Sequence, residues 1–284
     1  MALSISNAFI TLFTSEVHHA FQGARSLAGL VREKTGVIGS TVKFPRLGTG
    51  QATIRVPQSD IVPVNLSYSQ RTATMTDYVA GEYSDIFHQP KVNWSDRNEL
   101  ASSLANAMGR RIDQVLIDAL VASSSTGTVA NTVAEDGTSG SASGLNTGKI
   151  REAKKFLDQN NVPPSDRCLL IHANSLSALL SQTAVQSADF NTIRALVDGS
   201  VNTWLGFNII TIGDRDEGGL AIDGSSDRLV YAFHKEALGM GIGMNQSAKI
   251  DYVPEKTSFL IANMFSGGAT AIQDNGIVKI TTRE

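Results

Sequence analysis

The side chains best suited to chemistry are five histidines, and their spacing limits what they could do together. His18 and His19 are adjacent, so on a helix they point in different directions and form a poor pair of metal ligands. His88, His172 and His234 are far apart in the sequence. His172 and His234 each follow an expected strand, where α/β enzymes carry functional groups. Since no carboxylate or nucleophile pattern accompanies them, the sequence favours structural roles for both.

Two further reactive groups stand alone. Cys168 opens an apolar strand, which is typical of an inert buried thiol. Asp60 lies between Pro57 and Pro63, where its carboxylate could bind a cation, but a single acidic residue is usually solvated or paired with a neighbour. Because a metal site needs several converging ligands, the sequence predicts no metal-binding residue.

Glycine-rich patterns in the chain do not complete a nucleotide site. Gly148-Lys149 is followed by Ile150, and Ser143 stands where a phosphate-binding P-loop needs its first glycine. The alternating glycines at residues 239–243 are not followed by a helix signal, so they indicate flat or bulged backbone near a strand end. No G-x-S-x-G, H-E-x-x-H or C-x-x-C pattern occurs. The sequence therefore predicts no catalytic residue and no cofactor, and a protein that is not an enzyme.

The composition is that of an ordinary globular chain. Its 284 residues are 42% hydrophobic and 18% charged, enough for one large domain or two smaller ones. The formal net charge of -3 gives no basic surplus for binding nucleic acid. A single cysteine excludes an intrachain disulfide, no apolar run is long enough to span a membrane, and residues 1–21 lack a basic signal-peptide region. These features predict a cytosolic product that is not exported.

The N-terminal residues read as an arm. Five apolar residues recur at steps of four and predict an amphipathic helix: Ile5, Phe9, Phe13, Val17 and Phe21. A second, weaker helical stretch interrupted by glycines is expected to end near residue 34. An amphipathic helix near a chain end usually docks on its own domain or on a partner.

From Thr41 apolar residues alternate with polar ones, which predicts extended β-structure. Residues 42–56 and 64–75 form the two arms of an expected hairpin, with prolines on either side of its tip. Threonine, serine and arginine make up much of both arms, so at most one face is thinly buried. A polar hairpin of this length has little to pack on within its own subunit.

The hairpin leads into a long helix. Asp96 with Glu99 three residues later fits a capping box in its Asp variant, and apolar residues then recur every three or four positions. This pattern predicts a helix from Asp96 to about Ala122, roughly 40 Å long at 1.5 Å per residue. We expect such a helix to stiffen the subunit and to support other layers.

After a Ser/Thr/Gly-rich loop at residues 123–148, helices and strands alternate, which is typical of an α/β lobe. Helices are expected at residues 148–159 and 175–180. Strands are expected at residues 168–171, 207–212, 229–233, 248–252, 259–265 and 276–281. The predicted fold class is α+β.

Four segments carry a family resemblance through their order along the chain. They are the entry into the long helix, a proline-led strand, a glycine-aromatic strand and a late strand with its turn, at residues 93–116, 162–171, 205–210 and 232–239. In this order they resemble the major capsid proteins of tailed bacteriophages, which have the Hong Kong 97-type capsid fold. The hairpin and the long helix are most similar to those of the short-tailed podovirus type.

The resemblance implies a division of the chain into four parts. Residues 1–40 are the N-terminal arm and residues 41–81 the extended hairpin, or E-loop. Residues 82–125 and 246–284 form a peripheral domain that holds the long spine helix. Residues 126–245 form an α/β axial domain.

The function that the resemblance implies is structural. A major capsid protein self-assembles as hexamers and pentamers into an icosahedral shell that packages double-stranded DNA. The hairpin is expected to lie over a neighbouring subunit, and the arm to tie further neighbours together. The implied partners are further copies of the chain, a separate scaffolding protein, a portal protein and a decoration or cement protein, with no membrane and no sequence-specific DNA contact. The expected location is the virion, after assembly in the host cytoplasm.

Two departures from patterns within the family carry expectations. Some members begin with a long scaffolding segment that is later removed, whereas here the arm starts near Met1, so we expect an untrimmed subunit and a separate scaffold. Some members crosslink their subunits through a hairpin lysine and an asparagine of the next subunit. The only lysine of this hairpin is Lys43, at its base, so we expect a noncovalent shell or one reinforced by other proteins.

Two other interpretations stay open at the level of sequence. An encapsulin-like bacterial compartment has the same fold and holds protein cargo in place of DNA. An α/β enzyme with an unrecognised site around His172 and His234 belongs to a different functional class.

Overall fold

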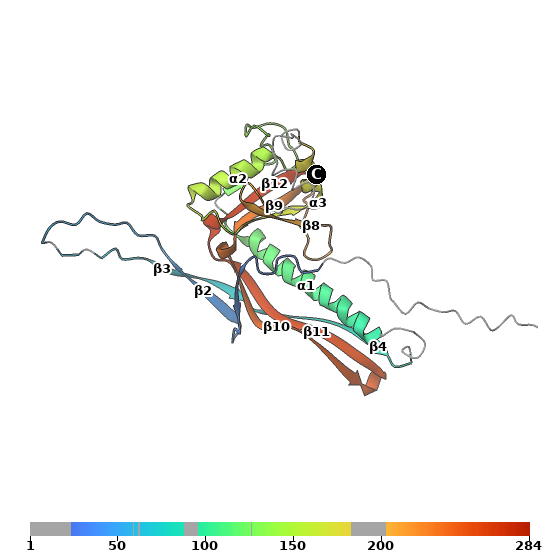
Figure 1. Cartoon of the computed structure of the whole chain (residues 1–284). Helices are drawn as coiled ribbons and strands as arrows, with labels where there is room; N and C mark the ends of the chain where they lie inside the picture. Colours follow the sequence, from blue (N-terminus) through green and yellow to red (C-terminus); the bar gives the residue numbers. More distant parts are fainter. Residues whose placement is uncertain (1–23, 59, 62, 88–95, 126, 183–202) are drawn as a thin grey trace, which may run out of the picture.

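The computed structural model describes residues 24–58, 60–61, 63–87, 96–125, 127–182 and 203–284. Two large sheets, one long helix and a projecting hairpin make up this part of the chain (Figure 1). Its helices and strands are, in chain order, β1 (Arg32–Thr35), β2 (Thr41–Leu47), β3 (Tyr68–Thr74), β4 (Thr76–Asp85), α1 (Asp96–Ala122), β5 (Gly127–Val129), α2 (Thr147–Gln159), β6 (Arg167–His172), α3 (Ala173–Leu180), β7 (Thr203–Trp204), β8 (Phe207–Ile212), β9 (Asp227–His234), β10 (Leu238–Val253), β11 (Ser258–Ala271) and β12 (Ile277–Arg283).

The helix α1 has the bounds that its local sequence predicts. Met108, Ile112, Leu116 and Leu120 follow one another at steps of four and are all buried, so they form the apolar stripe of the helix. The helix lies along one sheet and reaches the other (Figure 1). Its stripe joins one core cluster with residues of both sheets, and it therefore connects the two halves of the subunit.

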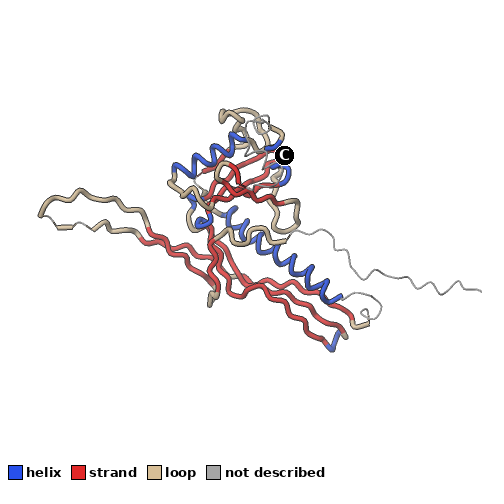
Figure 2. The backbone as a smooth tube through the Cα atoms, viewed as in Figure 1, coloured by secondary structure: helices blue, strands red, loops and turns tan. Residues whose placement is uncertain are grey.

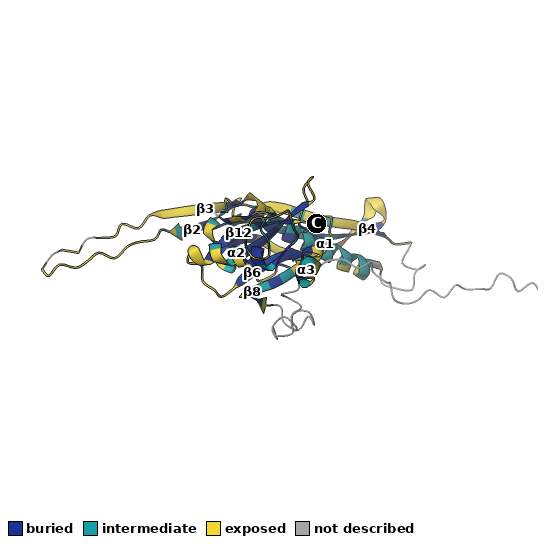
Figure 3. Ribbon diagram, turned by 90° about the horizontal axis from the view of Figure 1, so that it is seen from above, coloured by how far each residue is buried: buried dark blue, intermediate teal, exposed yellow. Residues whose placement is uncertain are grey.

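The four-stranded lobe consists of α1 and a sheet of order β1-β10-β11-β4. β10 and β11 are long antiparallel strands, β4 pairs antiparallel with β11, and β1 pairs parallel with β10. α1 packs on one face of this sheet, where Phe265 and Met240 are buried. Exposed residues mark much of β4 when the molecule is seen from above (Figure 3).

The six-stranded lobe has the strand order β5-β12-β9-β6-β8-β7. Its central strand β6 is buried along its whole length, and successive side chains point to opposite faces. Cys168 and Leu170 join the core cluster of α1, whereas Leu169 and Ile171 join the cluster under α2 and α3. β6 and β8 are parallel neighbours with α3 in the connection between them, which confirms the predicted α/β lobe.

A two-stranded ribbon of β2 and β3 projects away from both lobes (Figure 2). The strands pair antiparallel from Thr41↔Thr74 to Leu47↔Tyr68. Beyond this ribbon, residues 48–67 carry no strand pairing in the described part of the chain, so the strand-like arm expected through residues 54–56 is wrong in that detail. Only seven residues of each strand are paired, so the paired part of the hairpin is shorter than its sequence pattern predicts.

The expected end of the hairpin at residue 81 is also wrong. β3 ends at Thr74, and after Met75 the chain continues as β4, which pairs with β11 in the four-stranded lobe. Val79 and Tyr83 keep the alternating pattern of the hairpin, so periodicity alone could not separate the two strands.

The last strand of the chain does not lie with the rest of the segment 246–284, which the resemblance places in one peripheral domain. β12 pairs with β9 and β5 in the six-stranded lobe. β10 in turn begins at Leu238, within the segment 126–245 assigned to the axial domain, and lies in the four-stranded lobe. Strand partners are non-local, and the sequence carries no direct record of them.

The weak helix expected to end near residue 34 is absent. Residues 24–31 contain no helix, and Arg32–Thr35 is the strand β1. Gly29 and Gly36, on either side of this strand, have positive φ angles of 73° and 67°. A right-handed helix cannot continue through residues with such φ angles. The amphipathic helix expected at residues 5–21 lies outside the described residues, as do His18, His19 and His88.

Candidate assembly surface

The distal hairpin, residues 47–68, exposes many apolar side chains in the isolated subunit. Ile54 and Ile61 are 94% and 93% exposed, and Tyr68 is 84% exposed. The large apolar residues exposed on this segment are Leu47, Ile54, Val56, Ile61, Val64, Leu66 and Tyr68. Single exposed apolar residues are normal, but such a group on a segment that stands clear of the lobes indicates a contact surface (Figure 3).

The base of the hairpin is fixed by close packing on the four-stranded lobe. Val42 and Phe44 are buried with Ile272 in a small separate core cluster. A Cβ on Gly239 would lie only 2.9 Å from the ring of Phe44, and a Cβ on Gly241 would collide with Val42. Because these two β10 positions are glycines, the base of the hairpin can pack directly on the backbone of β10.

Polar contacts reinforce this base. The guanidinium of Arg71 on β3 forms an ion pair with Asp274, which lies between β11 and β12. The backbone N–H of Met75 donates to the carbonyl of Ser40 at 2.8 Å. Since Arg71 is nearly half exposed, the ion pair contributes less than about 1 kcal/mol, and most of the fixation comes from the buried cluster.

Charge is divided between the hairpin and β4. The hairpin, residues 41–75, has four basic residues and one acidic residue, a net charge of 4 − 1 = +3: Lys43, Arg46, Arg55, Arg71 and Asp60. The strand β4 has three acidic residues and no basic one: Asp77, Glu82 and Asp85. Asp60 is exposed at the hairpin tip, and none of the described residues groups with it as a metal site.

A buried carboxylate holds the segment before β1 against the long helix. Asp113 of α1 is 0% exposed and accepts hydrogen bonds from the backbone N–H groups of Ser26 at 2.7 Å and Leu27 at 3.1 Å. Arg215 donates to the same carboxylate at 3.4 Å and to the hydroxyl of Ser26 at 2.9 Å. Burial raises the pKa of Asp113, against the lowering effect of these donors. Asp113 thus ties residues 24–31, the segment before β1, to both lobes.

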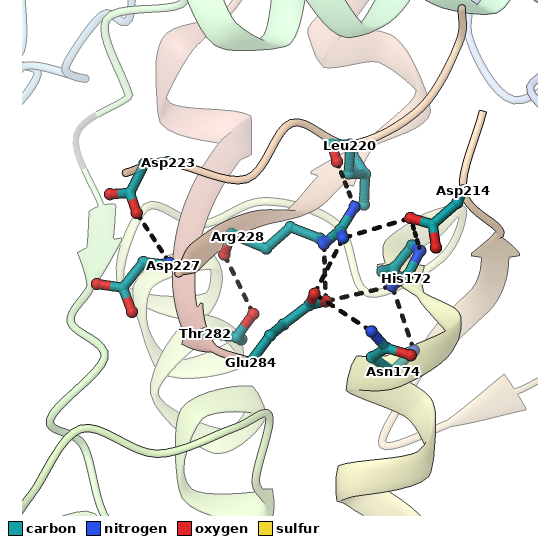
Figure 4. A network of polar contacts seen from close by, with 9 residues as sticks. All are labelled: His172, Asn174, Asp214, Leu220, Asp223, Asp227, Arg228, Thr282 and Glu284. Carbon is teal, nitrogen blue, oxygen red and sulfur yellow. Dashed lines mark hydrogen bonds and ion pairs between the residues drawn. The ribbon is translucent and has the colours of Figure 1, made fainter. Parts of the chain in front are cut away.

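His172 lies in a polar cluster at one end of the six-stranded sheet (Figure 4). Its side chain is buried, and its Nδ1 accepts a hydrogen bond from the N–H of Asn174 at 3.2 Å. Its Nε2 lies 3.0 Å from a carboxylate oxygen of Asp214, and Arg228 donates twice to Glu284, at 2.7 Å and 2.9 Å. No nucleophile joins the described cluster, which instead fastens β6, β9 and β12 together.

The Glu284 carboxylate is held in its charged form within this cluster. Burial alone would raise its pKa, but the hydrogen bonds from Arg228 and Asn174 hold the pKa below its ordinary value of 4.5. Arg228 itself is buried and also donates to the carbonyl of Leu220 at 2.5 Å. The two hydrogen bonds between Arg228 and Glu284 offset part of the cost of burying these charges.

His234 does not meet His172. It pairs in register with Arg167 at the start of β6, whereas His172 ends that strand. Five residues of strand at 3.3 Å each place the two backbone positions roughly 17 Å apart. The Nδ1 of His234 accepts a hydrogen bond from the N–H of Glu236 at 3.1 Å and caps the turn after β9. The structure therefore does not bring the two histidines into one site.

The remaining candidates have structural surroundings. Cys168 is buried in the core of β6, and burial raises the pKa of its thiol to about 11, in line with the predicted inert thiol. Lys149 lies in the first turn of α2 and not in a phosphate loop, and its Nζ donates to the carbonyl of Gly144 at 2.9 Å. No metal-ligand group and no helix able to cross a membrane occurs in the described ranges.

Sequence reasoning missed the buried charged residues that tie segments together. Asp113, Lys149 and Arg228 are at most 6% exposed, and each contacts backbone groups. One signal was available for Asp113, because it is an acidic residue directly beside Ile112 on the apolar stripe of the predicted helix. Its partners lie more than 80 residues away in the sequence and could not be named.

Comparisons with known proteins agree with this architecture. The family model described as phage capsid protein matches residues 5–284. The capsid structure of the cyanophage P-SCSP1u is similar at a TM-score of 0.76 and 16% identity, covering 97% of this chain and 93% of that one. The head structure of Helicobacter pylori bacteriophage KHP40 reaches a TM-score of 0.77 at 10% identity, covering 99% and 98%. The capsid of Ralstonia phage GP4 reaches 0.73 at 10% identity, covering 100% and 98%. No curated protein matches the sequence.

The two lobes, the spine helix between them and the projecting hairpin define the Hong Kong 97-type capsid fold. The chain belongs to the phage capsid protein family. Its function is that of a major capsid protein, the subunit of an icosahedral shell and a component of the virion. The family match favours this interpretation over an encapsulin-like compartment.

Proposed function

We propose that the chain assembles as hexamers and pentamers and that each distal hairpin lies over the adjacent subunit. The observation that carries the proposal is the group of exposed apolar residues on the distal hairpin, with Ile54 and Ile61 almost fully exposed. Covering these side chains on a neighbour removes apolar area from water at about 25 cal/mol per Å². The hairpin thus supplies a contact that a single subunit cannot make.

The two lobes suggest the parts of the shell that each one builds. We propose that the six-stranded lobe is the axial domain, made of residues 126–237 and 272–284. The four-stranded lobe is the peripheral domain, with α1, β4, β10 and β11 as its frame. The strand pairings support these bounds in place of those expected from sequence.

The shell is proposed to enclose double-stranded DNA without sequence-specific contacts. The net charge of -3 supports this, because a strongly basic lining would hold the DNA tightly while it enters. A separate scaffolding protein, a portal protein and a decoration or cement protein complete the proposed partners, and assembly is placed in the host cytoplasm. The shell role requires no catalytic step of this subunit.

The test is a subunit in which an Asn-Gly turn replaces residues 48–67 and connects β2 directly to β3. Because the hairpin base stays intact, we expect a folded subunit with unchanged circular dichroism and melting temperature. Electron microscopy and sedimentation should then find no closed shells. The matched control is Ile38→Ser, which removes an apolar side chain that is 97% exposed outside the distal hairpin. Normal shells from the shortened subunit would contradict the proposal.

A further inference from the structure

A pocket of about 560 Å³ lies between the hairpin ribbon and the six-stranded lobe. Arg46 and Ser67 line it from the ribbon, and His234 lines it from the end of β9. The remaining wall comes from the loop between α2 and β6 and from the turn before β12, which contribute Asn161 and Gln273. The pocket is therefore lined by polar groups from segments that are far apart in the sequence.

The imidazole of His234 faces the side of the sheet on which this pocket lies. Successive side chains of a strand point to opposite faces. In β9, Phe233 belongs to the core cluster of α1, whereas Ala232 belongs to the cluster under α2. His234 therefore lies on the α2 side, where Asn161 follows the end of the helix.

One nitrogen of this imidazole has no hydrogen-bond partner. Its Nδ1 accepts from the N–H of Glu236 at 3.1 Å, so the neutral ring carries its proton on Nε2. His234 is only 8% exposed, and no described residue accepts a hydrogen bond from its Nε2. Because a buried donor without an acceptor costs free energy, this site favours a ligand that brings an acceptor.

Arg46 supplies a positive charge on the opposite wall of the pocket. Val42 and Phe44 of the same strand are buried against the subunit, and Arg46 continues their alternation on that face. Among the residues that the structure describes, none forms an ion pair or a hydrogen bond with its guanidinium. A guanidinium presents paired N–H donors that match the oxygens of a phosphate or a carboxylate.

The nearby acidic residues are already paired. Glu236 is the one acidic residue among the described lining residues, and it forms an ion pair with Arg32 at 3.2 Å. Asp274, in the turn before β12, forms an ion pair with Arg71. The charge of Arg46 is therefore left for a ligand.

We propose that this pocket binds a small tetrahedral oxyanion of the phosphate class between Arg46 and His234. The guanidinium provides charge and two donors, and the Nε2–H of His234 provides a third donor. The side-chain amides of Asn161 and Gln273 can donate from the remaining wall. The inference goes beyond the shell function and does not depend on it, because all these groups belong to one subunit. A bound anion links the hairpin to the six-stranded lobe.

Equilibrium dialysis with radiolabelled inorganic phosphate tests the site on the purified full-length chain. We expect saturable binding of one phosphate per chain, with competition by sulfate and none by chloride at the same ionic strength. Binding of many phosphates per chain without saturation would overturn the proposal, because it would reflect general attraction to basic residues.

Arg46→Gln should weaken phosphate binding by at least about tenfold, because it removes the charge and its paired donors. The matched control is Lys43→Gln, which removes a basic residue from the opposite face of the same strand and should bind phosphate as the natural chain does. Equal losses in the two variants would show that no defined site exists.

His234→Asn separates the donor of His234 from its structural role. The Asn carbonyl can accept from the N–H of Glu236 in place of Nδ1, but the shorter side chain has no N–H that reaches the position of Nε2. We expect a normal circular dichroism spectrum and about tenfold weaker phosphate binding. Undiminished binding by folded His234→Asn would contradict the site. If this variant does not fold, the comparison of Arg46→Gln with Lys43→Gln decides.

Melting temperature gives an independent readout. Saturating phosphate should raise the melting temperature of the natural chain, because the ligand binds the folded state. Arg46→Gln should lose this rise, and Lys43→Gln should keep it. The same rise in Arg46→Gln would overturn the proposal and would leave the shell function untouched.

Discussion

Asp113 joins three segments through one side chain. Its carboxylate accepts hydrogen bonds from the backbone N–H groups of Ser26 and Leu27 and from the guanidinium of Arg215. Hydrogen bonds to an ionised acceptor contribute more than neutral ones, and removing the acceptor leaves the donors buried without a partner. The residue therefore matters more for the attachment of residues 24–31 than its position in the middle of a helix suggests.

Asp113→Ala is expected to lower the free energy of unfolding by about 2 kcal/mol, because the buried N–H of Leu27, the partly buried N–H of Ser26 and the guanidinium of Arg215 lose their acceptor. Limited proteolysis should cut near residue 26 earlier than in the natural chain. Asp118→Ala is the control, since Asp118 is an exposed acid on the same helix. Equal effects of the two variants would contradict the role of Asp113 in holding residues 24–31.

Glu284 gives a prediction for pH. Its pKa is lowered in the folded protein, so its contribution to stability is fully present above the ordinary value of 4.5. That contribution is lost as the pH falls through the lowered folded value. Glu284→Gln should therefore lower the melting temperature near pH 7 and flatten its decline in acid, measured by differential scanning calorimetry. A parallel decline in both proteins would contradict the assignment.

Asp113 acts with the opposite sign. Burial raises its pKa, so the stability linked to its protonation is present below the ordinary value of 3.8 and is lost as the pH rises through the raised folded value. As the pH falls, the contribution of Glu284 to stability decreases and that of Asp113 increases. Single variants are needed to separate the two contributions.

At the scale of elements, the hairpin and the four-stranded lobe meet through backbone contact. A Cβ on Gly268 would collide with the carbonyl oxygen of Thr74, at the end of β3. Only glycine fits this crossing, because the obstacle is backbone and cannot rotate away. The packing thus sets the direction in which the hairpin leaves the subunit.

Gly268→Ala is expected to cost at least about 2 kcal/mol through overpacking and to move the hairpin base. Thermal unfolding should detect the lower stability, and electron microscopy should find misshapen particles or none. Gly213→Ala is the control, because no heavy atom lies within 4 Å of its added Cβ. Unchanged stability and shells for Gly268→Ala would show that the crossing is not tight.

The reach of sequence-based prediction differs among these elements for a physical reason. The bounds of α1 follow from signals within the helix itself, so Asp96 to Ala122 is predicted to the residue. The end of the hairpin and the sheet that holds β12 depend on pairing with β11 and β9. Such partners are far away in the sequence, and alternation alone leaves them open.

The same contrast holds for the candidate surface. The polar hairpin and its need for a neighbour could be predicted from composition, and Lys43 could be placed at its base. The acidic strand β4 at the edge of the four-stranded sheet could not, because its sequence reads as a continuation of the hairpin. Buried ties such as Arg228 to Glu284 need coordinates as well.

At the scale of the whole molecule, the shell should hold together without covalent bonds between subunits. The distal hairpin carries no lysine, and Lys43 is confined to β2. Denaturing gels of purified shells are expected to show a single band near 30.2 kDa. A ladder of higher bands that survives reduction would reveal a covalent link.

Salt provides a further measurement on the assembled shell. The hairpin carries a net charge of +3 and β4 is acidic, so raising ionic strength from about 0.05 to 1 M should screen exposed charges between subunits and weaken assembly. Light scattering should then record a higher concentration for shell formation at high salt. Assembly that strengthens steadily with salt would favour apolar contacts alone.

The single residue between β3 and β4 has a mechanical consequence. Met75 is all that separates the ribbon from the strand paired with β11 in ten successive positions. A pull on the hairpin by a neighbour therefore travels along one continuous backbone into β4. It acts parallel to that strand and perpendicular to its interstrand hydrogen bonds, so these bonds are strained together in shear and not opened one at a time. The subunit is arranged to resist tension within the shell wall, the direction in which pressure from inside a closed container stretches it.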